Sequence, residues 1–333
     1  MRRGPPRAVR RTLNKMEIHV NDILLLVQKC AHTFSFYDLA TKTALKHIDL
    51  PNFPHEFTVD VERRYAYVGI FGIETAWSRS HDGDHRIAEI DLHERRLTRM
   101  LDLWPYYRPH GMAADSEGRL YAMSEADDLL LVFDRPREQV VPNLALPSGG
   151  IKTHLVTLTR DASVAYGIHL LSNTVTRFHP RDATVTPVAV MPGPRPEGNA
   201  LSSDEKTLYV ANRGDDTLVA IDTATMTCGR RVKTRSDPNR IYRTRGADGR
   251  DLLLLTNSGE RSISVFDAGH LEEIERIGLP ANPTALSFHP ARRSAFVSFQ
   301  DDFVRELNLD RWQFVDELRT LREPDASYVL SSV

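Results

Sequence analysis

The chain repeats one short pattern several times. The copy PEGNALSSDEKTLYVANRGDDTLVAID begins at Pro196, and PHGMAADSEGRLYAMSEADDLLLVFD, which begins at Pro109, aligns with it across a single gap. Further copies begin at Pro54, Thr153, Pro238 and Pro283. Repeats of about 40–45 residues are typical of ring-shaped or stacked folds. This internal repetition constrains the fold more than any single motif does.

Each copy has the same internal order. A Pro or Thr opens a short strand, a polar turn follows, and a second strand such as LYVAN or AYVGI leads through a loop to a third strand that ends in Asp. Apolar residues alternate with period two within these segments, which is typical of half-buried strands. Three or four short strands in each unit predict one blade of a β-propeller.

The two ends of the chain complement each other. From Leu24 the sequence matches the later part of a repeat and lacks its inner strand, whereas PDASYVLSSV, from Pro324 onward, matches an inner strand alone. We therefore predict an all-β fold, a seven-bladed β-propeller whose last blade is closed by the N- and C-terminal strands. Such closure removes exposed strand edges that could pair with other chains.

The first residues, MRRGPPRAVRRT, are basic and are not followed by the apolar segment that a secretory signal needs. We expect residues 1–16 to form a disordered basic tail, with either Met1 or Met16 as the start, and residues 17–333 to form a single propeller domain.

The composition excludes several classes of function. The 43 basic and 45 acidic residues nearly balance, so a nucleic acid is not expected as a partner. No apolar stretch of about 18 residues is present, so no membrane span is expected. Cys30 and Cys228 are too few for a disulfide framework or a cysteine-based zinc site, and they fit a reducing, cytoplasmic location.

The runs LYVANRGDDTLVAID, YAYVGIFG and LYAMSEADD resemble those of the YVTN-repeat and lactonase-like seven-bladed propellers, and the resemblance extends from Leu24 to Val333. It implies the same fold. It also suggests lactone hydrolysis as a reaction, although that broad group includes sugar-lactone hydrolases, metal-using enzymes and proteins with no known activity. Function must therefore be argued from the site.

The first strand of each propeller blade lines the central channel, so its first residues should meet at one mouth. The residues that follow each opening Pro or Thr are all polar, and they are His55, His110, His154, Glu197, Asn239, Thr284 and Asp325. Imidazoles and carboxylates are ligands for divalent Zn, Fe, Mn or Cu. We predict a metal site made of His55, His110, His154 and Glu197, with Glu197 or Asp325 as a general base.

Two alternatives remain open for this mouth. Its histidines could simply be solvated, or they could bind an anionic substrate when protonated or act as bases without a metal.

A second ring of loop residues should lie on the same face. One equivalent position in the loops between the second and third strands is taken by Gln28, Ser124, His169, Asn212, Asn257 and Ser298, and the adjoining loops add His32, Glu125, Arg213 and Asp216. From these and neighbouring positions we predict substrate-binding roles for Arg195, Asn239, Arg240, His169, Glu125 and Tyr107.

An insertion over residues 72–86, which contains Trp77 and His81, is expected either to cover the mouth or to form an uninvolved surface loop.

Two functions follow from these residues. The first is a metal-dependent enzyme that acts on a small molecule as a lactonase-like hydrolase, a lyase or an isomerase. The second is a non-catalytic propeller scaffold that binds a protein or a small ligand.

Overall fold

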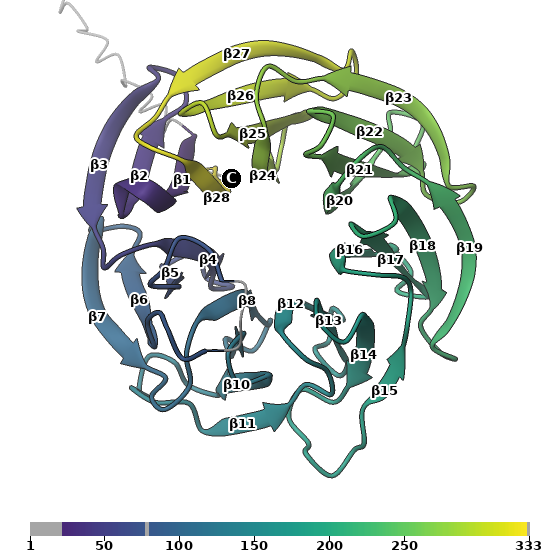
Figure 1. Cartoon of the computed structure of the whole chain (residues 1–333). Coiled ribbons are helices and arrows are strands. Elements are labelled where there is room, and N and C mark those ends of the chain that lie inside the picture. Colours follow the sequence, from purple (N-terminus) through teal and green to yellow (C-terminus); the bar gives the residue numbers. More distant parts are fainter. Residues whose placement is uncertain (1–21, 77–79, 332–333) are drawn as a thin grey trace, which may run out of the picture.

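The structure is a computed structural model that describes residues 22–76 and 80–331. The predicted tail over residues 1–16 and Trp77 of the insertion lie outside these residues. Within the described ranges the strands form seven four-stranded antiparallel sheets, which are arranged as blades around a central opening (Figure 1). The prediction of an all-β, seven-bladed propeller is therefore confirmed. No helix in the described part of the chain is long and apolar enough to cross a membrane.

Blades 1 to 3 follow one another along the chain, each from its inner to its outer strand. Blade 1 contains β4 (Pro54–Val59), β5 (Tyr65–Ile70), β6 (Arg86–Asp91) and β7 (Arg96–Asp102). Blade 2 contains β8 (Pro109–Ala114), β9 (Leu120–Ser124), β10 (Leu129–Phe133) and β11 (Leu144–Pro147). Blade 3 contains β12 (Thr153–Leu158), β13 (Ala165–His169), β14 (Thr174–Phe178) and β15 (Val188–Val190).

Blades 4 to 6 repeat the same order. Blade 4 contains β16 (Pro196–Leu201), β17 (Thr207–Asn212), β18 (Thr217–Asp222) and β19 (Thr227–Lys233). Blade 5 contains β20 (Pro238–Arg245), β21 (Asp251–Asn257), β22 (Ser262–Asp267) and β23 (Glu272–Gly278). Blade 6 contains β24 (Pro283–Phe288), β25 (Ser294–Phe299), β26 (Phe303–Asn308) and β27 (Gln313–Arg319).

Blade 7 joins the two ends of the chain, as predicted. It contains β28 (Pro324–Leu330) as the inner strand, followed by β1 (Ile23–Gln28), β2 (Thr33–Asp38) and β3 (Thr43–Asp49), with the short 3-10 helix η1 (Lys29–Ala31) between β1 and β2. The pairing of β1 with β28 is antiparallel, from Ile23 opposite Leu330 to Leu26 opposite Ser327. Main-chain hydrogen bonds thus hold the ring closed.

The hydrophobic core lies between neighbouring blades. Strand β1 shows how it forms: Leu25 and Val27 pack into a cluster with blade 1, whereas Leu24 and Leu26 pack into a cluster with blade 6. Successive side chains of a strand point to opposite faces, and both faces of this blade are covered by other blades. That double burial explains why β1 reads as the continuous apolar run ILLLV instead of an alternating pattern.

The closure of the ring can be tested on β28. Val329 is 3% exposed within the cluster between blades 6 and 7, whereas Val315 on the outer strand β27 is 54% exposed. We expect Val329→Asp to lower the free energy of unfolding by more than about 3 kcal/mol, because it buries an unpaired carboxylate. Val315→Asp, the matched control, should change it by less than about 0.5 kcal/mol. Equal effects in chemical denaturation would contradict the proposed role of β28.

Candidate functional site

A cavity of about 470 Å³ opens where the inner strands begin. This volume is in the range of small-molecule sites. Every inner strand starts at the Pro or Thr that the repeat indicated, and its second residue lines the cavity. These residues are His55, His110, His154, Glu197, Asn239, Thr284 and Asp325. Seven positions far apart in the sequence are thus brought to one mouth by the ring.

In five blades the second ring of lining residues lies one position later than predicted, and in blade 6 it lies two positions later. The predicted residues Gln28, Ser124, His169, Asn212 and Asn257 end their strands and are fully buried inside the blades, as is Ser298. The residue directly after each second strand lines the cavity instead, and this set is Lys29, Phe71, Glu125, Leu170, Arg213, Ser258 and Gln300. The shift has a simple cause, because consecutive side chains of a strand alternate between faces.

A third set precedes the inner strands. The residue before the opening Pro or Thr has a positive φ of 50–59° in six blades, although none of these residues is glycine: Phe53, Arg108, Lys152, Arg195, Asp237 and Glu323. Non-glycine residues in this region are uncommon. Four of them, Lys152, Arg195, Asp237 and Glu323, line the cavity. Of this set, the sequence analysis singled out Arg195 alone.

Three histidine rings lie in contact across blades 1 to 3, with His55 and His110 edge to face and His110 and His154 tilted. The rings of His110 and His154 lie 3.7 Å apart between centroids, and those of His55 and His110 lie 4.5 Å apart. His55 Nδ1 is 2.6 Å from Asp325 Oδ2, which ties His55 to the inner strand of blade 7. His110 is 1% exposed and His154 is 9% exposed.

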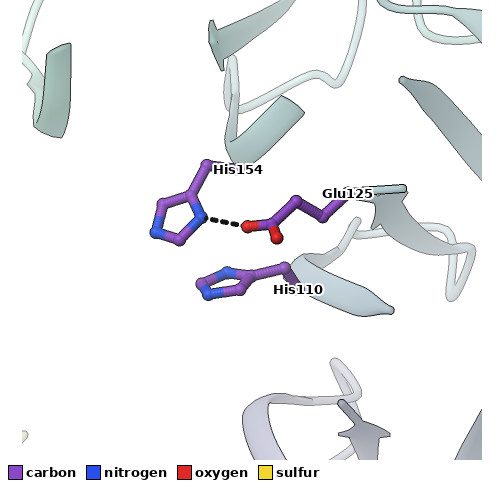
Figure 2. Close-up of side chains that lie close together, drawn as sticks. All are labelled: His110, Glu125 and His154. Atoms are coloured by element: carbon purple, nitrogen blue, oxygen red, sulfur yellow. Dashed lines mark hydrogen bonds and ion pairs between the residues drawn. The ribbon is translucent and has the colours of Figure 1, made fainter. Parts of the chain in front are cut away.

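Carboxylates surround His154. Its Nδ1 donates a hydrogen bond of 2.7 Å to Glu125 Oε2, and its Nε2 lies 3.6 Å from Glu197 Oε1 (Figure 2 shows the Glu125 contact). Glu125 Oε1 also lies 3.7 Å from Arg108 Nε, and Arg108 is fully buried. The sequence analysis placed Glu125 among substrate-binding residues, whereas the structure places it within the histidine cluster.

The cluster shifts the pKa values of its two buried histidines in opposite directions. Burial lowers the pKa of His110 well below its usual range, and the positive charges of His154 and His55 add to this effect. Burial also disfavours the charged form of His154, but its contacts with Glu125 and Glu197 outweigh burial and raise its pKa. Burial similarly opposes ionisation of Glu197, but His154 and Arg213 lower its pKa. Two adjacent imidazoles thus differ in their affinity for a proton.

Two of the predicted arginines are engaged in ion pairs within the wall of the cavity. Arg213 Nη1 donates to Glu197 Oε2 at 2.7 Å, and its other nitrogens bind both carboxylate oxygens of Asp237. Arg240 Nη2 donates to Glu56 Oε1 at 2.8 Å. Arg195 lies at the exposed rim, and its side chain makes no hydrogen bond or ion pair with the described residues.

Two buried ligand atoms in this cluster have no hydrogen-bond partner among the described residues: His110 Nδ1 and Glu125 Oε1. His110, Glu125 and His154 each offer a ligand atom, and these atoms lie within 4.8 Å of one another (Figure 2). A nitrogen and oxygen donor set of this kind suits Zn, Fe or Mn. Compared with the predicted metal ligands, Glu125 joins this group, whereas His55 contacts Asp325 and Glu197 contacts Arg213.

His169 and Tyr107, predicted to bind substrate, do not line the cavity. His169 is buried within blade 3, where its ring nitrogens contact Thr153 Oγ1 at 2.9 Å and Thr176 Oγ1 at 2.7 Å. A Cβ atom at Gly150 would lie 2.1 Å from His169 Cγ, so glycine is required there to make room for the ring.

The ring of Tyr107 stacks on His81 of the insertion. The described part of the insertion does reach the cavity, which is lined by Glu74, Thr75 and Ala76. The Lys152 ammonium donates a hydrogen bond to the Ala76 carbonyl and so links the insertion to blade 3. The insertion thus forms part of the rim.

Comparisons with known proteins identify the fold. No protein-family model matches the chain, and no curated protein matches its sequence. Among solved structures, a protein of unknown function from Desulfotomaculum acetoxidans DSM 771 is 13% identical, with a TM-score of 0.74 over 93% of this chain and 98% of that one. A "putative 6-phosphogluconolactonase" from Bacteroides fragilis NCTC 9343 is also 13% identical, with a TM-score of 0.73 over 95% and 99% of the two chains.

The dihydro-heme d1 dehydrogenase NirN, in complex with DHE, is 12% identical with a TM-score of 0.67. The match covers 89% of this chain and 63% of NirN, so the chain spans less than two thirds of that protein's length. At these identities the likeness shows the fold alone. The class of protein that the structure defines is the seven-bladed β-propeller.

The role of His169 can be tested through pH. Burial lowers its pKa to about 4, whereas an unfolded histidine titrates near 6.5. The unfolded chain therefore binds the proton first, so this stabilisation is complete above pH 6.5 and is lost as pH falls toward 4. The loss between pH 7 and pH 5 should be about 2 kcal/mol.

The variant His169→Gln should lack this pH-dependent loss of unfolding free energy when urea unfolding is measured at pH 7 and at pH 5. His93→Gln, a control on a 74% exposed side chain, should retain it. If wild type and His169→Gln lose stability in parallel, His169 is not a neutral buried residue.

Proposed function

We propose that this propeller is a metal-dependent enzyme that acts on a small molecule in the central cavity, with hydrolysis of a lactone as the first reaction to examine. The observation that carries the proposal is the pair of buried atoms without hydrogen-bond partners, His110 Nδ1 and Glu125 Oε1, in one cluster with His154. Glu125 Oε1 is 3.7 Å from Arg108 Nε, whereas His110 Nδ1 has no partner among the described residues. A buried polar atom without a partner costs about 1–3 kcal/mol, and a cation bound by His110 Nδ1 would remove that cost.

The residues present fit a divalent transition metal. His110 is held neutral by burial, and a neutral imidazole is the form that binds metals. Glu125 supplies a carboxylate, and His154 completes the group. When bound, the metal would polarise a substrate carbonyl or activate a water molecule.

The surrounding side chains would prepare the cavity for this chemistry. Arg213 holds Glu197 ionised next to His154, so Glu197 offers a carboxylate at the cavity surface, and its lowered pKa makes it a weak base until a substrate displaces Arg213. Asp325 fixes the ring of His55 through a 2.6 Å contact and offers a second carboxylate on the opposite side of the histidine cluster. We therefore retain Glu197 and Asp325 as the candidate general bases.

The same residues suit a lyase or an isomerase, because both reactions also use a polarised carbonyl and a carboxylate base. The reaction class is decided by screening lactones first and then hydroxy acids and sugars. A non-catalytic scaffold is the outcome expected if the cluster binds no metal and no substrate is turned over.

The metal site can be tested by elemental analysis of protein purified without a histidine tag. We expect nearly one equivalent of Zn, Fe or Mn in the wild type after reconstitution. The variants His110→Ala, Glu125→Gln and His154→Ala should each weaken metal affinity at least about 10-fold, because each loses a ligand. The same variants should lose turnover of any lactone that the wild type hydrolyses.

His93→Ala is the matched control, since the side chain of His93 is 74% exposed and contacts Glu94 at the surface. It should bind metal like the wild type. Circular dichroism must show that every variant is folded. No metal binding by the folded wild type, or equal binding by His93→Ala and the three cluster variants, would overturn the proposal.

A further inference from the structure

Lys29 is a largely buried lysine of the cavity wall whose ammonium group has no polar partner among the described residues. It is the first residue of η1, which follows β1, and it lines the cavity although the residue is only 9% exposed. Its backbone nitrogen donates to the Glu323 carbonyl oxygen. Its ammonium group makes no hydrogen bond or ion pair with any of the described residues, including the neighbouring carboxylates of Glu323 and Asp325.

Three other cations of the cavity have partners. Arg213 and Arg240 form ion pairs with carboxylates, and the Lys152 ammonium donates to the Ala76 carbonyl. Arg195 also lacks a recorded side-chain partner among the described residues, but it lies at the exposed rim. Lys29 follows β1 and Arg195 precedes β16, and these strands lie on different sides of the central opening (Figure 1).

The Lys29 side chain is largely buried, and an ammonium group that is partly removed from water is stabilised by a nearby negative charge. Four of the carboxylates around the cavity have other partners, whereas Glu74 lies exposed at the rim. Glu125 and Glu197 contact His154, Asp325 contacts His55, and Glu323 accepts a hydrogen bond from the Cys30 thiol. An anion that enters the cavity is the partner that this arrangement lacks.

The positive charge of Lys29 also reaches the histidine cluster. Burial is the main reason that the pKa of His110 is low, and Lys29 is among the charges that lower it further. Lys29 likewise helps His55 to lower the pKa of Asp325 against the effect of burial. A group bound at Lys29 would therefore lie within electrostatic range of the proposed catalytic cluster.

We propose that Lys29 binds an anionic group, a carboxylate or a phosphate, of the small molecule that occupies the cavity, with Arg195 as a second contact at the rim. This inference rests on the proposed function in taking the cavity as the substrate site. It goes further by assigning the substrate a negative charge and by naming the residue that recognises it. A lysine ammonium is a compact point charge that suits either group.

The test measures binding in metal-free protein by isothermal titration calorimetry. The probes are glycerol 3-phosphate, glycerate and neutral glycerol, which separate a phosphate from a carboxylate and both from the uncharged molecule. We expect the wild type to bind at least one of the anions and not glycerol. Lys29→Gln should weaken that binding about 10- to 100-fold, as expected when a charge-assisted contact is lost.

Lys46→Gln is the matched control, because Lys46 lies exposed on the outer strand β3. It should bind like the wild type, Lys29→Arg should retain part of the affinity, and Arg195→Gln should weaken binding less than Lys29→Gln does. Thermal unfolding checks that each variant is folded. If Lys29→Gln does not fold, the anion affinities of Lys29→Arg and Arg195→Gln are compared with that of the wild type instead.

The proposal is overturned if the wild type binds neither anion better than glycerol, or if folded Lys29→Gln binds as tightly as wild type. If Lys29→Gln does not fold, the proposal is overturned when neither Lys29→Arg nor Arg195→Gln changes the affinity for the anion. Because no metal is present in this experiment, its failure would leave the proposed metal-dependent function standing. Failure of the metal analysis would equally leave the anion site intact.

Discussion

The pairing of β1 with β28 is the interaction on which the site depends. It joins the two ends of the chain through antiparallel main-chain hydrogen bonds and completes blade 7. Because the ring is closed, the starts of all seven inner strands meet around one cavity. The contact between His55 of blade 1 and Asp325 of β28 crosses this closure directly, so one wall of the site is made from both the early and the last part of the chain.

The cavity brings opposite charges and neutral imidazoles together at close range. Contacts with Glu125 and Glu197 raise the pKa of His154 against the effect of burial, whereas burial lowers the pKa of His110 beside it. This difference arises from position: His154 has two carboxylates within reach, and His110 has other histidines as neighbours. A neutral nitrogen ligand next to an acid–base pair is the arrangement expected of a reactive site, and burial makes each interaction stronger than it would be in water.

The fold could be predicted from the sequence because each inner strand is marked by a Pro or Thr and the third strand of several blades ends at an Asp. The same marks placed His55, His110 and His154 correctly at one mouth. The second ring failed by one residue, since His169 ends a strand whose alternation turns it into blade 3. The ion pairs of Arg213 with Glu197 and Asp237 and the isolation of Lys29 could not be predicted, because both depend on side-chain directions that the repeat pattern does not specify.

The central claim is that His110, Glu125 and His154 form a metal site. The most direct measurement is X-ray diffraction from crystals reconstituted with Zn²⁺, with data collected on both sides of the zinc absorption edge. We predict one strong anomalous peak within about 2.0–2.3 Å of a ligand atom from each of these three residues. The absence of such a peak, or a peak bound only by surface residues, would contradict the account.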